Sequence, residues 1–297
     1  MKRFFIKNAS LLLPCGLQTG SIEFDSTITA LRRSNDSCAP DYECETLDAH
    51  GGFVVPGLFD IHTHGAYGAD FSDADFSDRN VLNDIHECSI HECSIHECSN
   101  YKCNEFDVDS FPLNSPLFRL SRYYLSQGVT SFLATTMTLC AEELFAAMHS
   151  IDAFCRMRDE FIKRTPNKLH HLAGAKCIGI NLEGPFLSSS KRGSQAECNL
   201  LAPDAALFHQ LNAASGGRIN MRNMGSSGSK CGNCRVVVVS FGISPSDAFF
   251  AASYAPFASV FGDSVPFGLE CGRAADLAVF DANLNLKAVF MDGERML

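Results

Sequence analysis

The sequence predicts an α/β fold of the (β/α) barrel type, in which parallel strands alternate with helices. One observation is the β-branched run 129–136, which is typical of a buried strand and follows a helical stretch, 118–127, that Gly128 ends. Another is the segment 141–163, whose apolar residues have helical spacing and which leads to a third strand at 175–184. Strand, helix, strand order implies parallel strands with right-handed crossovers, and such barrels carry their chemistry at the carboxyl ends of the strands.

Length and composition bound the class of protein. A chain of 297 residues can hold one large domain, or one domain and a smaller one, and 46% hydrophobic with 20% charged residues are globular values. The net charge of −10 and the pI near 5.4 argue against binding to nucleic acid or to an anionic membrane surface. An acidic soluble enzyme fits these values better.

We expect a cytoplasmic location. No stretch of the sequence approaches the ~20 apolar residues of a membrane span. Lys7 and Asn8 interrupt the apolar start of the chain before it reaches the length that a signal peptide needs. In the cytoplasm, the 14 cysteines are expected to be mostly reduced.

The first 53 residues are expected to form a small β layer. Short apolar runs at 4–6, 11–13 and 22–24 alternate there with Gly, Asn, Asp and Ser, which is the pattern of short strands and turns. No titratable cluster occurs in this part of the sequence, so we place no chemistry in it.

An apolar run from Val54 ends in two histidines, His62 and His64, directly before Gly65. If the run is a strand, both imidazoles point to the same side, because side chains alternate with a period of two. Two imidazoles at the end of a strand make half of a divalent-metal site; the alternative is that they are hydrogen-bonded core residues. The Gly-rich stretch 65–71 either lines this site or forms a plain surface turn.

The segment 85–99 repeats Ile-His-Glu-Cys-Ser three times. His, Glu and Cys are all zinc ligands, so a metal-binding module is one interpretation. A period of five, however, places successive histidines about 140° apart around a helix, so they do not share one face. We favour a low-complexity expansion in a surface loop, and we interpret the Cys-x-x-Cys pair Cys231 and Cys234 as part of a linker.

A carboxylate ends the third strand. Glu183 precedes Gly184 and so lies at the carboxyl end of its strand, as His62 and His64 do. A salt bridge or a cap to the next loop is one role for it, but a buried charge without a partner costs several kcal/mol. A metal ion shared with the two histidines would be a sufficient partner, so the sequence predicts a metal site made of His62, His64 and Glu183.

These residues carry a family resemblance. Pro56–Gly65, with Gly68–Phe71 behind it, resembles the first barrel strand of the amidohydrolase superfamily, and in particular of the N-acetylglucosamine-6-phosphate deacetylases. Thr130–Thr138 is similar to the second strand of that family, and Asn181–Phe186 to its most specific motif. Further similar segments are Lys191–Gly193, Leu201–Asp204, Ser253–Pro256 and Gly272–Asp281.

The family pattern is interrupted after 216–221, which resembles the start of a fourth strand. The resemblance implies a second half of the barrel, which supplies two more metal histidines, a substrate-contacting His and Asn, and the catalytic aspartate. On the order of 100 residues are missing if a barrel takes ~250, and a Gly- and Ser-rich stretch, 223–234, leads instead to Val236–Val239. The catalytic and substrate-binding residues stay unassigned, because none of the following matches a missing position: His170, His171, Ser194, Gln195, His209 and Asp247.

The resemblance implies a truncated TIM-type (β/α) barrel over residues 54–265, with a low-complexity insertion at about 85–115. It also implies a small β-sandwich domain built from both ends of the chain, residues 1–53 and 266–297. An open half-barrel would leave strand edges unpaired and apolar faces uncovered, so we expect poor stability or a partner.

The activity implied by the resemblance is metal-dependent removal of the acetyl group from N-acetylglucosamine 6-phosphate, a reaction of amino sugar catabolism. A divalent ion is the implied cofactor, with zinc as first choice and iron, cobalt or manganese as alternatives. The implied partners are a small-molecule amino sugar phosphate and a second copy in a homodimer, with no nucleic acid and no membrane. The competing interpretation is a catalytically inactive remnant, or an incomplete gene product, of the same family.

Overall fold

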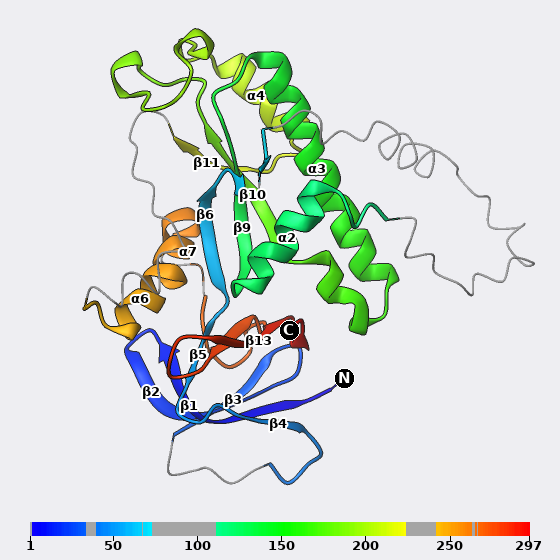
Figure 1. The fold of residues 1–297 in the computed structure, drawn as a ribbon, viewed down its shortest axis with the longest axis vertical. Helices are drawn as coiled ribbons and strands as arrows, with labels where there is room; N and C mark the ends of the chain where they lie inside the picture. The colour runs from blue at the N-terminus through cyan, green and yellow to red at the C-terminus, as the bar shows by residue number, and fades with distance from the viewer. Residues whose placement is uncertain are drawn as a thin grey trace, which may run out of the picture.

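The computed structural model describes residues 2–33, 40–66, 68–72, 111–223, 242–262, 265 and 267–297. A sheet built from both ends of the chain lies at one end of the long axis, and a parallel sheet with its helices lies at the other (Figure 1). The predictions for the repeat at 85–99, for the Cys231 and Cys234 pair and for Val236–Val239 concern residues outside the described part.

The sheet from the two ends, called the terminal sheet below, has the strand order β14-β13-β12-β5-β1-β2-β3, with β4 paired to β1. The expected β layer is therefore present, but the apolar runs at 4–6 and 11–13 belong to one long strand that bulges between Ile6 and Ala9. The strands are β1 (Phe4–Leu13), β2 (Gly16–Phe24), β3 (Ile28–Arg33), β4 (Glu45–Asp48), β5 (Phe53–Pro56), β12 (Leu277–Phe280), β13 (Leu286–Met291) and β14 (Glu294–Arg295).

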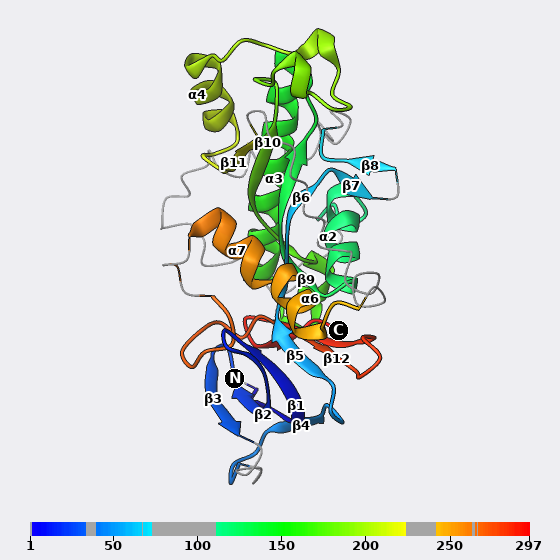
Figure 2. The same cartoon turned by 90° about the vertical axis from the view of Figure 1, so that its left-hand side faces the viewer.

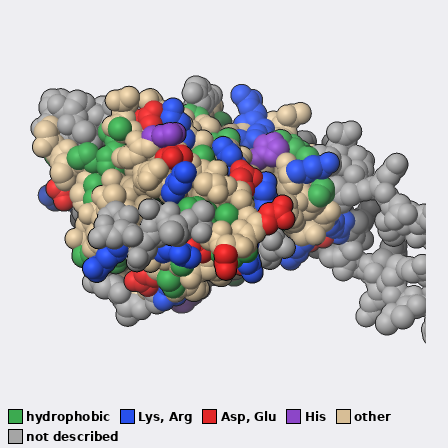
Figure 3. All heavy atoms as spheres, turned by 90° about the horizontal axis from the view of Figure 1, so that it is seen from below, with side chains coloured by type: hydrophobic (Ala, Val, Ile, Leu, Met, Phe, Trp, Pro, Cys, Tyr) green, Lys and Arg blue, Asp and Glu red, His purple; other side chains and the backbone are tan. Residues whose placement is uncertain are grey.

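The terminal sheet buries a core of aromatic and aliphatic side chains. The rings of Phe4, Phe24 and Phe290 meet there with centroids 4.9 to 5.3 Å apart, so residues from both ends of the chain share one core. Seen from below, this end of the molecule carries basic and acidic side chains close to one another (Figure 3). One ion pair, Arg295 Nη1 to Glu45 Oε1 at 3.3 Å, joins β14 to β4.

The second sheet has four parallel strands in the order β11-β10-β9-β6, as the alternation of strands and helices predicted. A helix lies between each pair of successive strands, and three of the four strands were expected at nearly these positions. The elements are β6 (Leu58–Thr63), α2 (Pro116–Ser126), β9 (Val129–Thr136), α3 (Ala141–Arg164), β10 (Lys176–Glu183), α4 (Ala205–Ala214) and β11 (Ile219–Asn223).

The apolar face that we expected to be uncovered is covered by α7. The helices α2 and α3 lie on one side of the parallel strands, while α6 (Pro245–Ala252) and α7 (Tyr254–Phe261) lie on the other (Figure 1). Phe59, Ile61 and Leu133 are buried on that second side, with Phe257 and Phe261 packed against them. None of the described helices combines the length and the hydropathy needed to cross a bilayer.

The chain passes from one sheet to the other at Gly57. The single strand expected from Val54 to the histidines is two strands: β5 pairs with β1 and β12 of the terminal sheet, and β6 opens the parallel sheet. Gly57 lies between them, and its N–H donates to Asp276 O at 2.9 Å.

Replacing Gly57 by Ala is expected to lower the free energy of unfolding by about 1–3 kcal/mol, the usual cost of overpacking a core. A methyl group at this position would lie 2.1 Å from Thr130 Oγ1 and 2.5 Å from its Cγ2. Urea denaturation measures the effect. Adding Thr130→Ala should recover part of the loss, and strictly additive effects of the two substitutions would contradict this explanation.

A half-buried carboxyl group beside Gly57 gives the fold a pH dependence. Burial, and next the charge of Asp292, raise the pKa of Asp276 from 3.8 to about 6. A carboxyl group with a raised folded-state pKa contributes stability that is fully present below pH 4 and is lost as the pH rises through 6. The variant Asp276→Asn should therefore be about 1–2 kcal/mol more stable than the wild type at pH 8, and equal to it at pH 4. Urea denaturation at the two pH values checks this; equal stability at pH 8 would contradict it.

Candidate metal centre

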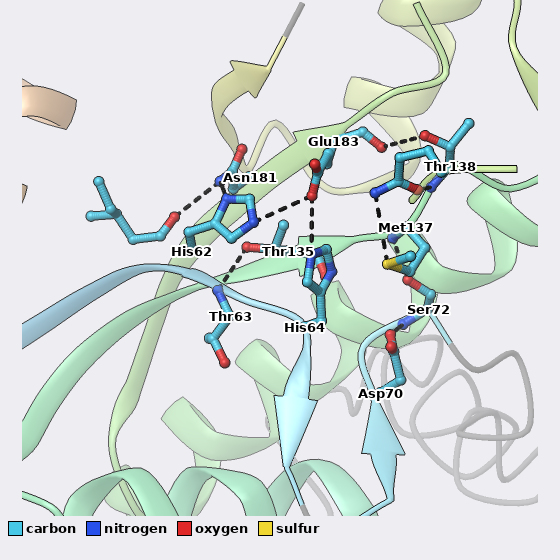
Figure 4. Close-up of polar contacts among 12 residues, drawn as sticks. His62, Thr63, His64, Asp70, Ser72, Thr135, Met137, Thr138, Asn181 and Glu183 are labelled. Atoms are coloured by element: carbon cyan, nitrogen blue, oxygen red, sulfur yellow. Dashed lines mark hydrogen bonds and ion pairs between the residues drawn. The ribbon is translucent and has the colours of Figure 1, made fainter. Parts of the chain in front are cut away.

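The three predicted ligands meet at the carboxyl ends of two parallel strands, β6 and β10, that are separated by one strand. His62 lies at the end of β6, His64 directly follows that strand, and Glu183 is the last residue of β10. Strand β9 runs between β6 and β10 and places Thr135 under the cluster (Figure 4). One nitrogen of each histidine and one oxygen of Glu183 lie within 4.8 Å of one another. This is the geometry that one ion bound by all three side chains requires.

Glu183 Oε2 is the point on which the two imidazoles converge. It lies 3.3 Å from His62 Nε2 and 3.0 Å from His64 Nε2, and the two rings are nearly perpendicular. These are ion-pair distances without hydrogen-bond geometry, because this buried oxygen accepts no hydrogen bond within the described residues. The contacts with His62 and His64 nevertheless outweigh burial and hold the pKa of Glu183 well below its usual range.

The ring of His64 is oriented by the backbone of β9. Its Nδ1 lies 3.2 Å from Thr135 O, and because a carbonyl only accepts, Nδ1 carries the proton. In the neutral ring, Nε2 then directs a lone pair at the Glu183 carboxylate. Two electron-rich atoms 3.0 Å apart need a proton or a metal ion near them, so the donor set fits a divalent cation. Without a metal, burial opposes a charge on His64, but the contact with Glu183 prevails and raises the pKa of this histidine.

Asn181, two residues before Glu183 on β10, holds the ring of His62. Its Nδ2 donates to Ile61 O at 3.0 Å and lies 3.1 Å from His62 Nδ1. Asn181 is fully buried, and its Oδ1 accepts no hydrogen bond among the described residues. This contact fixes the orientation of the His62 imidazole, whose Nε2 faces Glu183.

Two further carboxylates influence the cluster. Asp60 is buried on β6 below His62, and its Oδ1 accepts the His62 N–H at 3.1 Å. Burial raises the pKa of Asp60 to about 6. Asp70 lies in a hairpin of β7 (Gly65–Ala66) and β8 (Ala69–Asp70) and contributes to the raised pKa of His64. The Gly-rich stretch after the histidines is therefore this hairpin, and it stands beside the metal ligands (Figure 4).

The loop after Glu183 closes over the end of β9. Gln195 is buried, and its Oε1 accepts the N–H of Thr138 at 2.8 Å. Asn199 Nδ2 donates to Thr138 O at 3.1 Å, which fixes the loop at a second point. Gln195 thus has a structural contact in this loop.

The remaining candidates from the sequence make other contacts. His170 Nδ1 lies 2.6 Å from Glu294 Oε2 of the terminal sheet. His209 lies on α4, and Asp247 lies in the first turn of α6, where its Oδ2 accepts from Ser244. The structure therefore brings together His62, His64 and Glu183, with Asn181 as a neighbour that the sequence analysis did not single out.

The fold of this chain is similar to that of solved N-acetylglucosamine-6-phosphate deacetylases. Over the whole chain, the structure superposes on N-acetylglucosamine-6-phosphate deacetylase from Pasteurella multocida (TM-score 0.65, 13% identity, 99% of each chain). It also superposes on the Mycobacterium smegmatis enzyme in complex with N-acetyl-D-glucosamine-6-phosphate (TM-score 0.64, 15% identity, 100% of each chain). At these identities the superpositions show the fold alone.

Over part of its length, the sequence is similar to N-acetylglucosamine-6-phosphate deacetylases. N-acetylglucosamine-6-phosphate deacetylase of Bos taurus is 28% identical over 178 residues, which are 60% of this chain and 32% of that protein. The Bacillus subtilis enzyme is 27% identical over 168 residues, 57% of this chain and 30% of the enzyme. No protein-family model matches the chain. Over the matched segment this chain is similar to these deacetylases, and it spans about a third of their length.

Proposed function

We propose that this chain is a metal-dependent amide hydrolase that removes the acetyl group from N-acetylglucosamine 6-phosphate. The observation that carries the proposal is the convergence of His62 Nε2 and His64 Nε2 on Glu183 Oε2 at the carboxyl ends of two parallel strands. The four parallel strands support a truncated TIM-type barrel as the framework of this site. The substrate is inferred from the relatives, which are named for this deacetylation.

The chain's own residues supply the parts that a catalytic metal site needs. Three protein ligands and one open position are the usual minimum for catalytic zinc, and His62, His64 and Glu183 reach that number. The low pKa of Glu183 keeps its carboxylate charged at neutral pH, and Asn181 holds the His62 ring in place. When bound, a divalent ion polarises the amide carbonyl and lowers the pKa of a water toward ~7. Zinc is the first choice, with iron, cobalt or manganese as alternatives.

Acetate release tests the proposal. The full chain loaded with zinc should release acetate from N-acetylglucosamine 6-phosphate, and the metal-free chain should not. His62→Ala, which removes one ligand, should reduce the release to the metal-free level, whereas His50→Ala, an exposed histidine of the terminal sheet, should leave it unchanged. No acetate above the metal-free control would overturn the proposal.

A second candidate is a catalytically inactive remnant or an incomplete gene product of the family. It is favoured by the short match, about a third of the relatives' length, and by the absence of a residue matched to the family's catalytic aspartate. Zinc bound at the three ligands without acetate release would support it. The cytoplasmic location, the homodimer and the lack of nucleic-acid or membrane partners stay predictions.

A further inference from the structure

A pocket lies behind the hairpin that follows His62 and His64. It has a volume of about 440 Å³ and is enclosed between Ala66 and Ala69 of the hairpin and the outer face of α2. Figure 2 shows β7 and β8 beside this helix. On α2 the pocket is lined by Arg119, Arg122 and Tyr123, which share one face because they are spaced i, i+3 and i+4.

Within the described part of the chain, neither guanidinium group of the pocket forms an ion pair with a carboxylate. Among the described residues, eight other arginines lie within 4.0 Å of a carboxylate, but neither Arg119 nor Arg122 does. Burial, and next the charge of Arg119, lower the pKa of Arg122. Two like charges held together in this way favour an anion between them, and in a chain with a net charge of −10 such a pair is unusual.

The position of Arg122 is fixed, and the pocket wall is partly apolar. Arg122 Nη1 donates to Leu172 O at 3.1 Å, which leaves the other N–H groups of the guanidinium for a ligand. A phosphate dianion matches two guanidinium groups in charge and in the paired geometry of its oxygens, better than a single carboxylate does. The ring of Tyr123 adds surface on which the organic part of a ligand can pack.

We infer that this pocket binds a phosphate monoester of a small organic molecule through Arg119 and Arg122. The site is separate from the metal ligands, yet the hairpin joins the two: Ala66 and Ala69 line the pocket, and the hydrogen bond from Phe71 N to His64 O (2.8 Å) closes the hairpin onto a metal ligand. The inference does not depend on the proposed hydrolysis, because it rests on α2 and the hairpin alone.

Calorimetric titration of the metal-free full chain tests the inference, since phosphate held by a metal is then excluded. Glucose 6-phosphate should bind at one saturable site, inorganic phosphate should bind more weakly, and glucose should not bind. Arg119→Glu should weaken binding of glucose 6-phosphate at least tenfold; Arg119 is exposed, so this variant should fold. Arg122→Gln should weaken it similarly, and Arg33→Glu, at an exposed position of β3, should leave it unchanged.

Three results would contradict the inference. Wild-type protein that shows no saturable binding of glucose 6-phosphate would remove the site, and so would undiminished binding in a folded Arg119→Glu variant. Equal affinity for inorganic phosphate and glucose 6-phosphate would contradict the claim that the ligand is a phosphate monoester, and would indicate a site for free phosphate. Circular dichroism of each variant establishes that it is folded.

Discussion

Replacing Glu183 by Gln is expected to weaken zinc binding by at least about 100-fold, since loss of a mere neighbour of a metal ligand already costs 10–100-fold. The substitution removes the negative charge on which both imidazoles converge, while it keeps the size of the side chain. Competition with a chromophoric chelator measures the affinity. Acetate release, if the proposed function is correct, should fall with the bound zinc.

A matched control lies in the following loop. Glu197 is exposed, accepts a hydrogen bond from Ser189 and pairs with Arg192, and none of these residues touches the cluster. The variant Glu197→Gln should therefore bind zinc as the wild type does. Equal zinc affinity in the Glu183→Gln and Glu197→Gln variants would show that Glu183 is no ligand.

Replacing Asn181 by Ala is expected to weaken zinc binding by about 10–100-fold although Asn181 donates no ligand atom. Its amide holds both Ile61 O and the His62 ring, so its loss frees the imidazole to rotate away from Glu183. The same chelator competition measures this effect on folded protein, after circular dichroism has shown that the fold is kept.

Asn199→Ala is the control for this prediction. Asn199 also donates its amide to a backbone carbonyl, that of Thr138, at the same end of the strands, but it does not contact a histidine. Its variant should retain wild-type zinc affinity. If Asn181→Ala and Asn199→Ala had the same effect, the role of Asn181 would be general stability rather than orientation of His62.

The helices and strands that carry the site could be predicted from the sequence. The β-branched run of β9 and the apolar spacing in α3 are local signals, and they place both elements nearly at their observed bounds. The clustering of His62, His64 and Glu183 could be predicted for a similar reason, because each of them ends an apolar strand and parallel strands align their carboxyl ends.

Features that depend on tertiary contacts could not be predicted from the sequence. The run from Val54 is continuous in hydropathy, yet it changes sheets at Gly57, where Thr130 approaches too closely for a side chain. Asn181 lies inside an apolar strand, and nothing local distinguishes it from a buried polar residue with a structural role. The sequence also did not predict that α7 covers the sheet. The helix Tyr254–Phe261 is largely apolar, and such a helix is expected to make contacts on more than one side.

X-ray absorption at the zinc edge, on the full chain with one equivalent of zinc, tests the metal centre most directly. The account predicts a first shell of nitrogen and oxygen at about 2.0–2.2 Å, with the outer scattering of two imidazoles from His62 and His64. Sulfur neighbours at about 2.3 Å would assign the ion to cysteines, such as those of the repeat at 85–99, and would contradict a centre built from His62, His64 and Glu183.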